Sequence, residues 1–293
     1  MQALSVRQIS VSDMSSKKKY ILPAVLYALL ACGLVIGALY DYQISKTLTS
    51  FNDSWAYFLE KWAEPPSLLF VGFVFSALSI CIVSENKKGK YYLAILCFIC
   101  GCAINSVTCV RTAEYYGIEG YTPLCIAIGV VFSVIFTIAS TKIDTELLIK
   151  AKNAFICVVA IALATLVIIS VVKSLWGRMR FRELTDISDF TKWYIPVGKA
   201  ADDAHKSFPS GHTSNAVMLY GIVLILETMG KKLASQVAKY LCIVWIAIVM
   251  LSRIACGAHF LSDTCMGAMI TMTIVIVCRT FIIDRSRKNI NGK

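Results

Sequence analysis

The sequence predicts an all-α membrane protein, a bundle of helices that crosses a bilayer several times. Hydrophobic residues make up 57% of its 293 positions and charged residues only 16%, whereas charged residues form nearer a quarter of a soluble domain. The mean hydropathy is +0.69, and apolar stretches long enough to cross about 30 Å of hydrocarbon recur along the chain. This composition disfavours a soluble enzyme, a disordered chain and a disulfide-stapled secreted module.

The chain has eight apolar stretches of membrane-spanning length. They cover residues 20–40, 67–84, 91–110, 122–140, 154–172, 213–229, 239–255 and 262–281. The first is too long for the apolar part of a secretory signal and lacks a clear cleavage site, so we expect a retained anchor. We expect residues 91–283 to form a six-span core. Residues 1–90 would add a tail, two more spans and an outer amphipathic segment, and residues 284–293 would form a basic tail.

The loop charges predict the orientation of these spans. Of the 29 lysines and arginines, 18 lie in the two termini and in the loops near residues 87–90, 142–152 and 231–239. Cytoplasmic loops of membrane proteins carry such a basic excess. We therefore expect a multi-pass protein of the cell membrane with both termini cytoplasmic. The same bias accounts for the net charge of +11 without a nucleic-acid partner.

A second group of cations lies on the opposite, outer side. It comprises Lys173, Arg178, Arg180, Arg182, Lys192, Lys199, Lys206 and Arg253. This group breaks the orientation rule locally and indicates an anionic ligand on the outer face.

Residues 43–62 form another outer feature. Apolar side chains recur there at spacings of four and three, at Ile44, Leu48, Phe51, Trp55, Phe58 and Trp62. This spacing predicts one amphipathic helix. It would lie in the membrane interface or pack on the outer ends of the bundle, and the sequence leaves both arrangements open.

Three groups of polar residues stand at the outer ends of spans. In the first, Lys173 closes the fifth span and Arg180 follows seven residues later. Seven residues are nearly two helical turns, so the two cations would share a face if the helix continues. Snorkelling of the side chains to the interface would also explain such cations.

The second group is Pro209-Ser210-Gly211-His212, which precedes the sixth span. Ser210 is a good helix N-cap, and Gly211 lets the backbone approach a ligand. The free amides of this helix start would form an anion site with the His212 imidazole beside it. A simple helix cap is the alternative.

The third group is Ser252-Arg253, followed by His259 and Asp263. Residues four apart are neighbours on one helical face. The Asp263 carboxylate would then accept a hydrogen bond from one ring nitrogen of His259 and leave a lone pair on the other. A purely structural hydrogen bond is the alternative.

Together the three groups supply cations, a helix N-terminus, two imidazoles and a carboxylate on one side of the membrane. Phosphoryl transfer needs these groups. Their order and spacing resemble the motifs of the type 2 phosphatidic acid phosphatase family, over residues 91–283. One departure is Phe181, where the family usually has proline; it loses a fixed φ but leaves every cation in place.

The resemblance implies a role for each matched residue. His259 would be the nucleophile that forms a phosphohistidine, and Asp263 would orient it. His212 would protonate the leaving oxygen and then activate water. The phosphoryl oxygens would be bound by Lys173, Arg180, Ser210, Gly211 and Arg253. No metal and no cofactor are expected.

The remaining polar residues of the outer side have no motif role in this interpretation. We expect Arg178, Arg182 and Lys206 to be solvated loop cations, with attraction of anionic head groups as the alternative, and His205 to be a surface histidine.

The resemblance implies a metal-independent lipid phosphatase with an extracytoplasmic site. Its substrate would be a polyprenyl diphosphate or a phosphatidate-type lipid in the bilayer, with the polyprenyl carrier favoured if the source is bacterial. A phosphotransferase on the same scaffold and a non-catalytic lipid-binding or transport protein are the alternatives. An inert relative should lack an essential group, and none is missing. A haloperoxidase is disfavoured because those enzymes are soluble.

Overall fold

The computed structural model describes the backbone of residues 2–50, 52–85, 89–118 and 120–285, and side chains from Ile21 onward. The expected cytoplasmic lysines at 17–19, 87 and 88 and most of the basic tail lie outside the described side chains. Every regular element in the described ranges is a helix. The α-helices are α1 (Gln2–Leu48), α2 (Ser54–Trp62), α3 (Pro65–Ser84), α4 (Tyr91–Tyr115), α5 (Thr122–Thr141), α6 (Thr145–Trp176), α7 (Gly211–Met218), α8 (Gly221–Thr228), α9 (Lys232–Ala255) and α10 (Leu261–Cys278).

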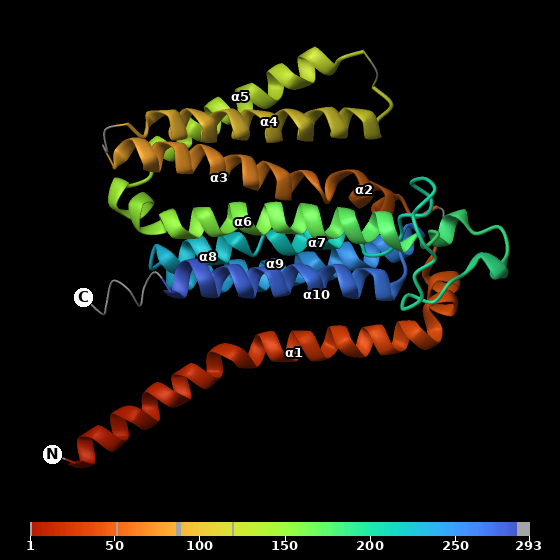
Figure 1. The fold of residues 1–293 in the computed structure, drawn as a ribbon, viewed down its shortest axis with the longest axis horizontal. Coiled ribbons are helices and arrows are strands. Elements are labelled where there is room, and N and C mark those ends of the chain that lie inside the picture. Colours follow the sequence, from red (N-terminus) through yellow and green to blue (C-terminus); the bar gives the residue numbers. More distant parts are fainter. Residues whose placement is uncertain (1, 51, 86–88, 119, 286–293) are drawn as a thin grey trace.

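Seven helical segments of the described chain are long and apolar enough to cross a membrane: α1, α2 with α3, α4, α5, α6, α9 and α10. The predicted all-α polytopic bundle is therefore confirmed. Helix α3 packs between the α4–α5 pair and α6, and α1 packs along α10 (Figure 1). Large apolar side chains on the outer helix faces stay exposed, as Leu166 and Leu241 do at 65% and 63%. Such exposed faces suit contact with lipid.

The expected span over residues 213–229 is helical but is not one continuous α-helix. Two eight-residue helices, α7 and α8, take its place. Between them the hydrogen bonding changes to the 3₁₀ type, in which the amide of Ile222 donates to the carbonyl of Leu219, three residues back. Gly221 follows the turn and packs tightly on α6, because a Cβ there would lie 2.6 Å from Val158 Cγ2.

Helix α6 carries the first motif lysine, and its ends are well defined. The Asp144 carboxylate caps its start by accepting from the amides of Glu146 and Leu147. Gly177 ends it with a φ of +65°, a conformation that favours glycine. The helix therefore does not continue to Arg180, so the condition for a shared helical face of Lys173 and Arg180 is not met.

The segment 43–62 is also not one helix. Helix α1 ends at Leu48 and α2 begins at Ser54. Helix α2 buries Ala56 against Ala255 and Cys256, so it packs on the end of the bundle. Its aromatic residues Trp55 and Phe58 remain exposed at 43% and 58%. The short helix thus has one face on the protein and an aromatic face directed outward.

The long loop between α6 and α7 and the junction between α9 and α10 lie at one end of the bundle. The start of α1 and the end of α10 lie at the other (Figure 1). All three predicted motif groups are therefore collected at the end that is remote from the start of α1 and the end of α10.

Candidate active site

A cavity of about 660 Å³ lies between α2, α3, α4, α6, α7 and α9. Six of the eight predicted site residues line it: Lys173, Arg180, Gly211, His212, Arg253 and His259. The other two, Ser210 and Asp263, are fully buried beside it. The structure thus brings the three motif groups together from positions up to 90 residues apart in the sequence.

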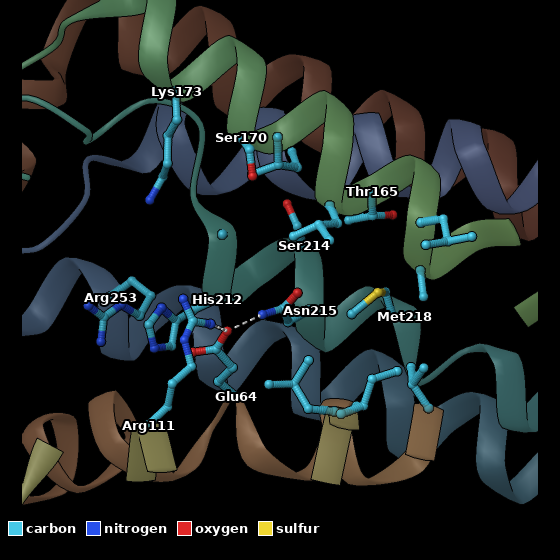
Figure 2. A pocket seen from close by; sticks show the side chains of 18 of the residues that line it. Glu64, Arg111, Thr165, Ser170, Lys173, His212, Ser214, Asn215, Met218 and Arg253 are labelled. Atoms are coloured by element: carbon cyan, nitrogen blue, oxygen red, sulfur yellow. Dashed lines mark hydrogen bonds and ion pairs between the residues drawn. The ribbon is translucent and has the colours of Figure 1, made fainter. Parts of the chain in front are cut away.

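Lys173 extends from the last turn of α6 toward the first turn of α7 (Figure 2). A Cβ on Gly211 would lie 3.8 Å from Lys173 Nζ, so the ammonium group faces the start of α7. The free amides of that helix start and the lysine charge both favour an anion between them.

Two arginines that line the cavity have buried N–H groups without a hydrogen-bond partner among the described residues. Arg253 is only 2% exposed, yet its Nε and Nη1 atoms are buried without a partner among the described residues. The Nε of Arg180 is also buried without a partner in the described part of the chain, whereas its Nη2 binds Asp203 at 2.7 Å. Buried N–H groups of charged side chains are costly to leave unpaired. These donors therefore indicate a site for the oxygens of an anionic ligand.

His259 lies just before α10, which begins at Leu261. Its Nδ1 lies 2.6 Å from the Ser207 carbonyl oxygen and 3.8 Å from Asp263 Oδ2. A carbonyl oxygen can only accept, so Nδ1 donates to it. Burial lowers the pKa of the His259 imidazole to about 3, so the ring is neutral near pH 7. Its Nε2 atom therefore has a free lone pair.

Two expectations about this histidine need correction. His259 and Asp263 do not share a helical face, because His259 precedes α10. The Asp263 carboxylate also does not take the imidazole hydrogen bond, since the Ser207 carbonyl takes it. Asp263 instead accepts from the Ser207 hydroxyl at 2.6 Å and from the Phe260 amide at 2.8 Å. The carboxylate thus fixes the loop segments on both sides of the imidazole.

Arg178 is not a solvated loop cation, contrary to expectation. It is 1% exposed and binds Asp263 at 2.6 Å and Asp41 at 3.0 Å. Its guanidinium also lies 4.1 Å from the centroid of the Phe260 ring, a favourable cation–π position. Asp41 comes from α1 and also accepts from the amide and hydroxyl of Ser262. The network of Asp41, Arg178, Ser262 and Asp263 therefore joins α1 to the start of α10.

A sequence signal for Asp41 exists. It is a carboxylate at the end of an apolar span, and ionisable residues in such positions are usually paired or functional. The sequence gives no comparable signal for Ser207.

His212 contacts α2. Its Nε2 lies 3.0 Å from the Glu60 carbonyl oxygen, so this nitrogen carries a hydrogen. The Glu60 carboxylate binds Arg253 Nη2 at 3.0 Å and Arg182 Nη1 at 2.9 Å. Arg182 therefore lines the cavity and is ion-paired with Glu60. The expectation that it is a solvated loop cation is wrong. Sequence reasoning missed Glu60, although it stands on the polar side of the amphipathic 43–62 pattern.

The remaining motif positions have structural partners. The Ser210 hydroxyl caps α7 by accepting from the Thr213 amide at 3.4 Å, as its position predicts. Phe181, which replaces the usual proline, packs edge-on against Tyr42 and Phe260. His205 binds Asp202 on the loop between α6 and α7.

Glu64 and Arg111 close the side of the cavity that α3 and α4 provide. The Glu64 carboxylate binds Arg111 at 3.0 Å and the Asn215 side-chain amide at 2.9 Å (Figure 2). Within the described ranges, no set of three or more His, Cys, Asp and Glu side chains is arranged to hold a metal ion.

Among known protein families, the PAP2 superfamily matches residues 153–287. This match supports membership of the PAP2 superfamily. The match contains all eight predicted site residues. No curated protein and no solved structure matches the chain significantly. Membership of the PAP2 superfamily points to a phosphatase that acts on a phosphorylated substrate, and the seven apolar helical segments indicate a multi-pass membrane protein.

Proposed function

We propose that this PAP2 protein hydrolyses a lipid phosphate or diphosphate through a phosphohistidine intermediate, at the outer face of the membrane. The observation that carries the proposal is the shape of its cavity. A cationic end holds the motif residues, and an apolar groove continues from it between the helices.

One face of α6 forms much of this groove. Its apolar lining residues on α6 are Val159, Ala162, Leu163, Leu166 and Ile169. At a rise of about 1.5 Å per residue, the 14 residues from Val159 to Lys173 extend over roughly 21 Å. Apolar side chains of α3 and α4, including Phe75 and Ile104, line the opposite side. A groove of this length suits an acyl or prenyl chain whose phosphate lies at Lys173.

In the first step, the Nε2 lone pair of His259 attacks phosphorus. A P–N bond forms and the bond from phosphorus to the leaving oxygen breaks. The Nδ1–H bond to the Ser207 carbonyl keeps the ring in the tautomer that this attack needs. The positive charge that develops on the ring is stabilised by the nearby Asp263 carboxylate, 3.8 Å from Nδ1.

The leaving oxygen takes a proton from the imidazolium form of His212. Burial and the Arg253 charge lower the pKa of this imidazole, and the negative charge of a bound phosphate would raise it again. The Nε2–H of this residue points at a carbonyl oxygen and would turn to the leaving oxygen when substrate is bound. In the second step His212 accepts a proton from water, which attacks the phosphohistidine and releases inorganic phosphate.

The unpartnered donors of Arg253 and Arg180, with Lys173 and the first amides of α7, would bind the three equatorial oxygens of the phosphoryl group. Donors that are already in place lower the cost of charge redistribution in the transition state. Removal of one such donor commonly costs about 100-fold or more in kcat.

Phosphate release from a substrate panel in mixed micelles tests the proposal. The panel is undecaprenyl diphosphate, phosphatidate, phosphatidylglycerol phosphate and glucose 6-phosphate. We expect the lipids to have the highest kcat/KM, with free phosphate as the product. The highest value for glucose 6-phosphate would contradict the lipid substrate, and a phosphorylated acceptor in place of free phosphate would indicate a transferase.

Three variants connect the activity to the site. His259→Ala and His212→Ala should each abolish turnover in protein that remains folded in detergent. Substantial activity of the His259→Ala protein would exclude His259 as the nucleophile. Ala162→Phe should fill the groove and lower kcat/KM for long-chain substrates more than for short-chain ones. Val167→Phe, on the 58% exposed outer face of the same helix, is its control.

A further inference from the structure

Glu60 places a carboxylate inside a cavity built for an anion. It belongs to α2, which precedes the segment that matches the PAP2 superfamily. The buried contact of Ala56 with Ala255 and Cys256 fixes the helix on the bundle. The carboxylate is fixed as well, because both of its oxygens accept from Arg182 and one of them also accepts from Arg253.

The charges that line the cavity can be compared with those of a substrate. The cations are Lys173, Arg111, Arg180, Arg182 and Arg253. The carboxylates are Glu60, Glu64 and Asp203. Five cations and three carboxylates among the described lining residues leave a net charge of +2. The Asp41–Arg178–Asp263 cluster behind His259 adds a net negative charge, so it lowers the positive potential further.

This balance suits a phosphate monoester, whose charge near pH 7 is about −2. A diphosphate ester brings a second ionised phosphoryl group, which two positive charges do not neutralise. Neutralisation by cations already in place is the main means by which such sites stabilise phosphoryl transfer.

Glu60 also lies near the expected position of the leaving group, and the leaving group is the part in which the two substrate classes differ. The His212 Nε2, which would protonate the leaving oxygen, is 3.0 Å from the Glu60 carbonyl. The leaving group is therefore released next to this residue. From a monoester it leaves as a neutral alcohol, whereas from a diphosphate it leaves as an anionic monophosphate that the carboxylate repels.

We propose that Glu60 is a specificity-determining residue that selects phosphate monoesters over diphosphates. The inference rests on the proposed function and narrows its substrate. It favours a phosphatidate-type or other monophosphorylated lipid over the polyprenyl diphosphate that the sequence resemblance favours for a bacterial source.

The test compares two substrates with the same chain, farnesyl phosphate and farnesyl diphosphate in mixed micelles. The wild type should have the higher kcat/KM for the monoester. Glu60→Gln removes one negative charge and keeps the side-chain shape. It should raise kcat/KM for the diphosphate, relative to the monoester, by about tenfold, as expected for one charge at ~10 Å in surroundings of intermediate dielectric.

Glu183→Gln is the matched control. Glu183 lies 3.4 Å from the same arginine, Arg182, but is 43% exposed and outside the cavity lining. Its variant should keep the wild-type preference. A wild type that prefers the diphosphate, or an unchanged ratio in Glu60→Gln, would overturn the role of Glu60 while the phosphatase assignment stands. Absence of phosphate release from every lipid tested would instead overturn the proposed function.

A second measurement does not depend on the variant folding. Orthophosphate and pyrophosphate can be compared as competitive inhibitors of the wild type. Orthophosphate should have the lower inhibition constant, and tighter inhibition by pyrophosphate would contradict the proposal.

Discussion

Asp41 and Arg178 lie 137 positions apart in the sequence and form an ion pair of 3.0 Å in which both side chains are completely buried. Arg178 simultaneously binds Asp263 at 2.6 Å. A helix outside the matched PAP2 segment therefore supplies a counter-ion to a network that touches the proposed catalytic residues.

Asp41→Asn should lower both stability and activity. Arg178 stays paired with Asp263, but its charge-assisted bond to Asp41 becomes a neutral one, and hydrogen bonds to charged groups contribute about 1.5–3 kcal/mol. Asp263 would also lose part of its fixed environment, so kcat should fall more than KM changes. The measurements are thermal unfolding in detergent and steady-state kinetics. Asp53→Asn, at a helix start where the side chain makes no capping bond, is the control. Wild-type melting and kcat in Asp41→Asn would show that the pair is dispensable.

Acidification should destabilise the protein through His259. Burial lowers the pKa of this imidazole to about 3 in the folded state, against about 6.5 in an unfolded chain. Below pH 6.5 the unfolded state binds a proton that the folded state does not, so stability falls with pH until about pH 3. Between pH 7 and pH 5 this contribution amounts to about 2 kcal/mol.

The comparison that isolates this effect is wild type against His259→Gln. Unfolding can be followed with a thiol-reactive dye, because several free cysteines are buried. The wild type should lose more stability than the variant between pH 7 and pH 5. Parallel pH profiles for the two proteins would mean that His259 can be protonated in the folded protein.

Activity should persist in excess chelator. The proposed mechanism neutralises the phosphoryl oxygens with Lys173, Arg180 and Arg253, so it assigns no step to a divalent ion. Phosphate release is measured with EDTA and again after Mg²⁺ is added. Loss of activity in EDTA that Mg²⁺ restores would exclude the metal-independent mechanism.

The proposed orientation makes the end of the bundle that carries the candidate active site extracytoplasmic. Ala201→Cys places a thiol on the exposed loop of that end. Lys142→Cys places one on the short loop at the opposite end. In a cysteine-depleted background, an impermeant thiol reagent should label the first in intact cells and the second only after permeabilisation. The reverse pattern would invert the topology.

Composition and motif spacing predict the all-α class, the position of most helices and the residues that meet in the cavity. The local geometry of these residues is less predictable. Lys173 and Arg180 reach one site from a helix and from a loop, because Gly177 ends the helix between them. His259 and Asp263 lie close together although only Asp263 is helical. In both pairs the spacing identified residues that lie close together, but the segment between them is not the continuous helix that was considered.

The contribution of α1 and α2 was not predictable from spacing. Asp41 and Glu60 lie more than 100 positions before the residues they bind, Arg178, Arg182 and Arg253. Long-range pairs of this kind depend on how the helices pack, and a single sequence carries no direct record of them. The same holds for the Ser207 carbonyl, since any residue would present one.

The ion pair between α1 and the loop after α6 also means that the matched PAP2 segment cannot be separated from the first helices without loss of contacts. A fragment restricted to residues 153–287 would retain every motif but would leave Arg178 without Asp41 and Arg253 without Glu60. Chimaeras that exchange only the first two helices with those of a relative would face the same mismatch, unless the acidic residues were exchanged along with their arginines. The smallest unit that can evolve or be engineered independently is therefore larger than the part of the chain by which its family is recognised.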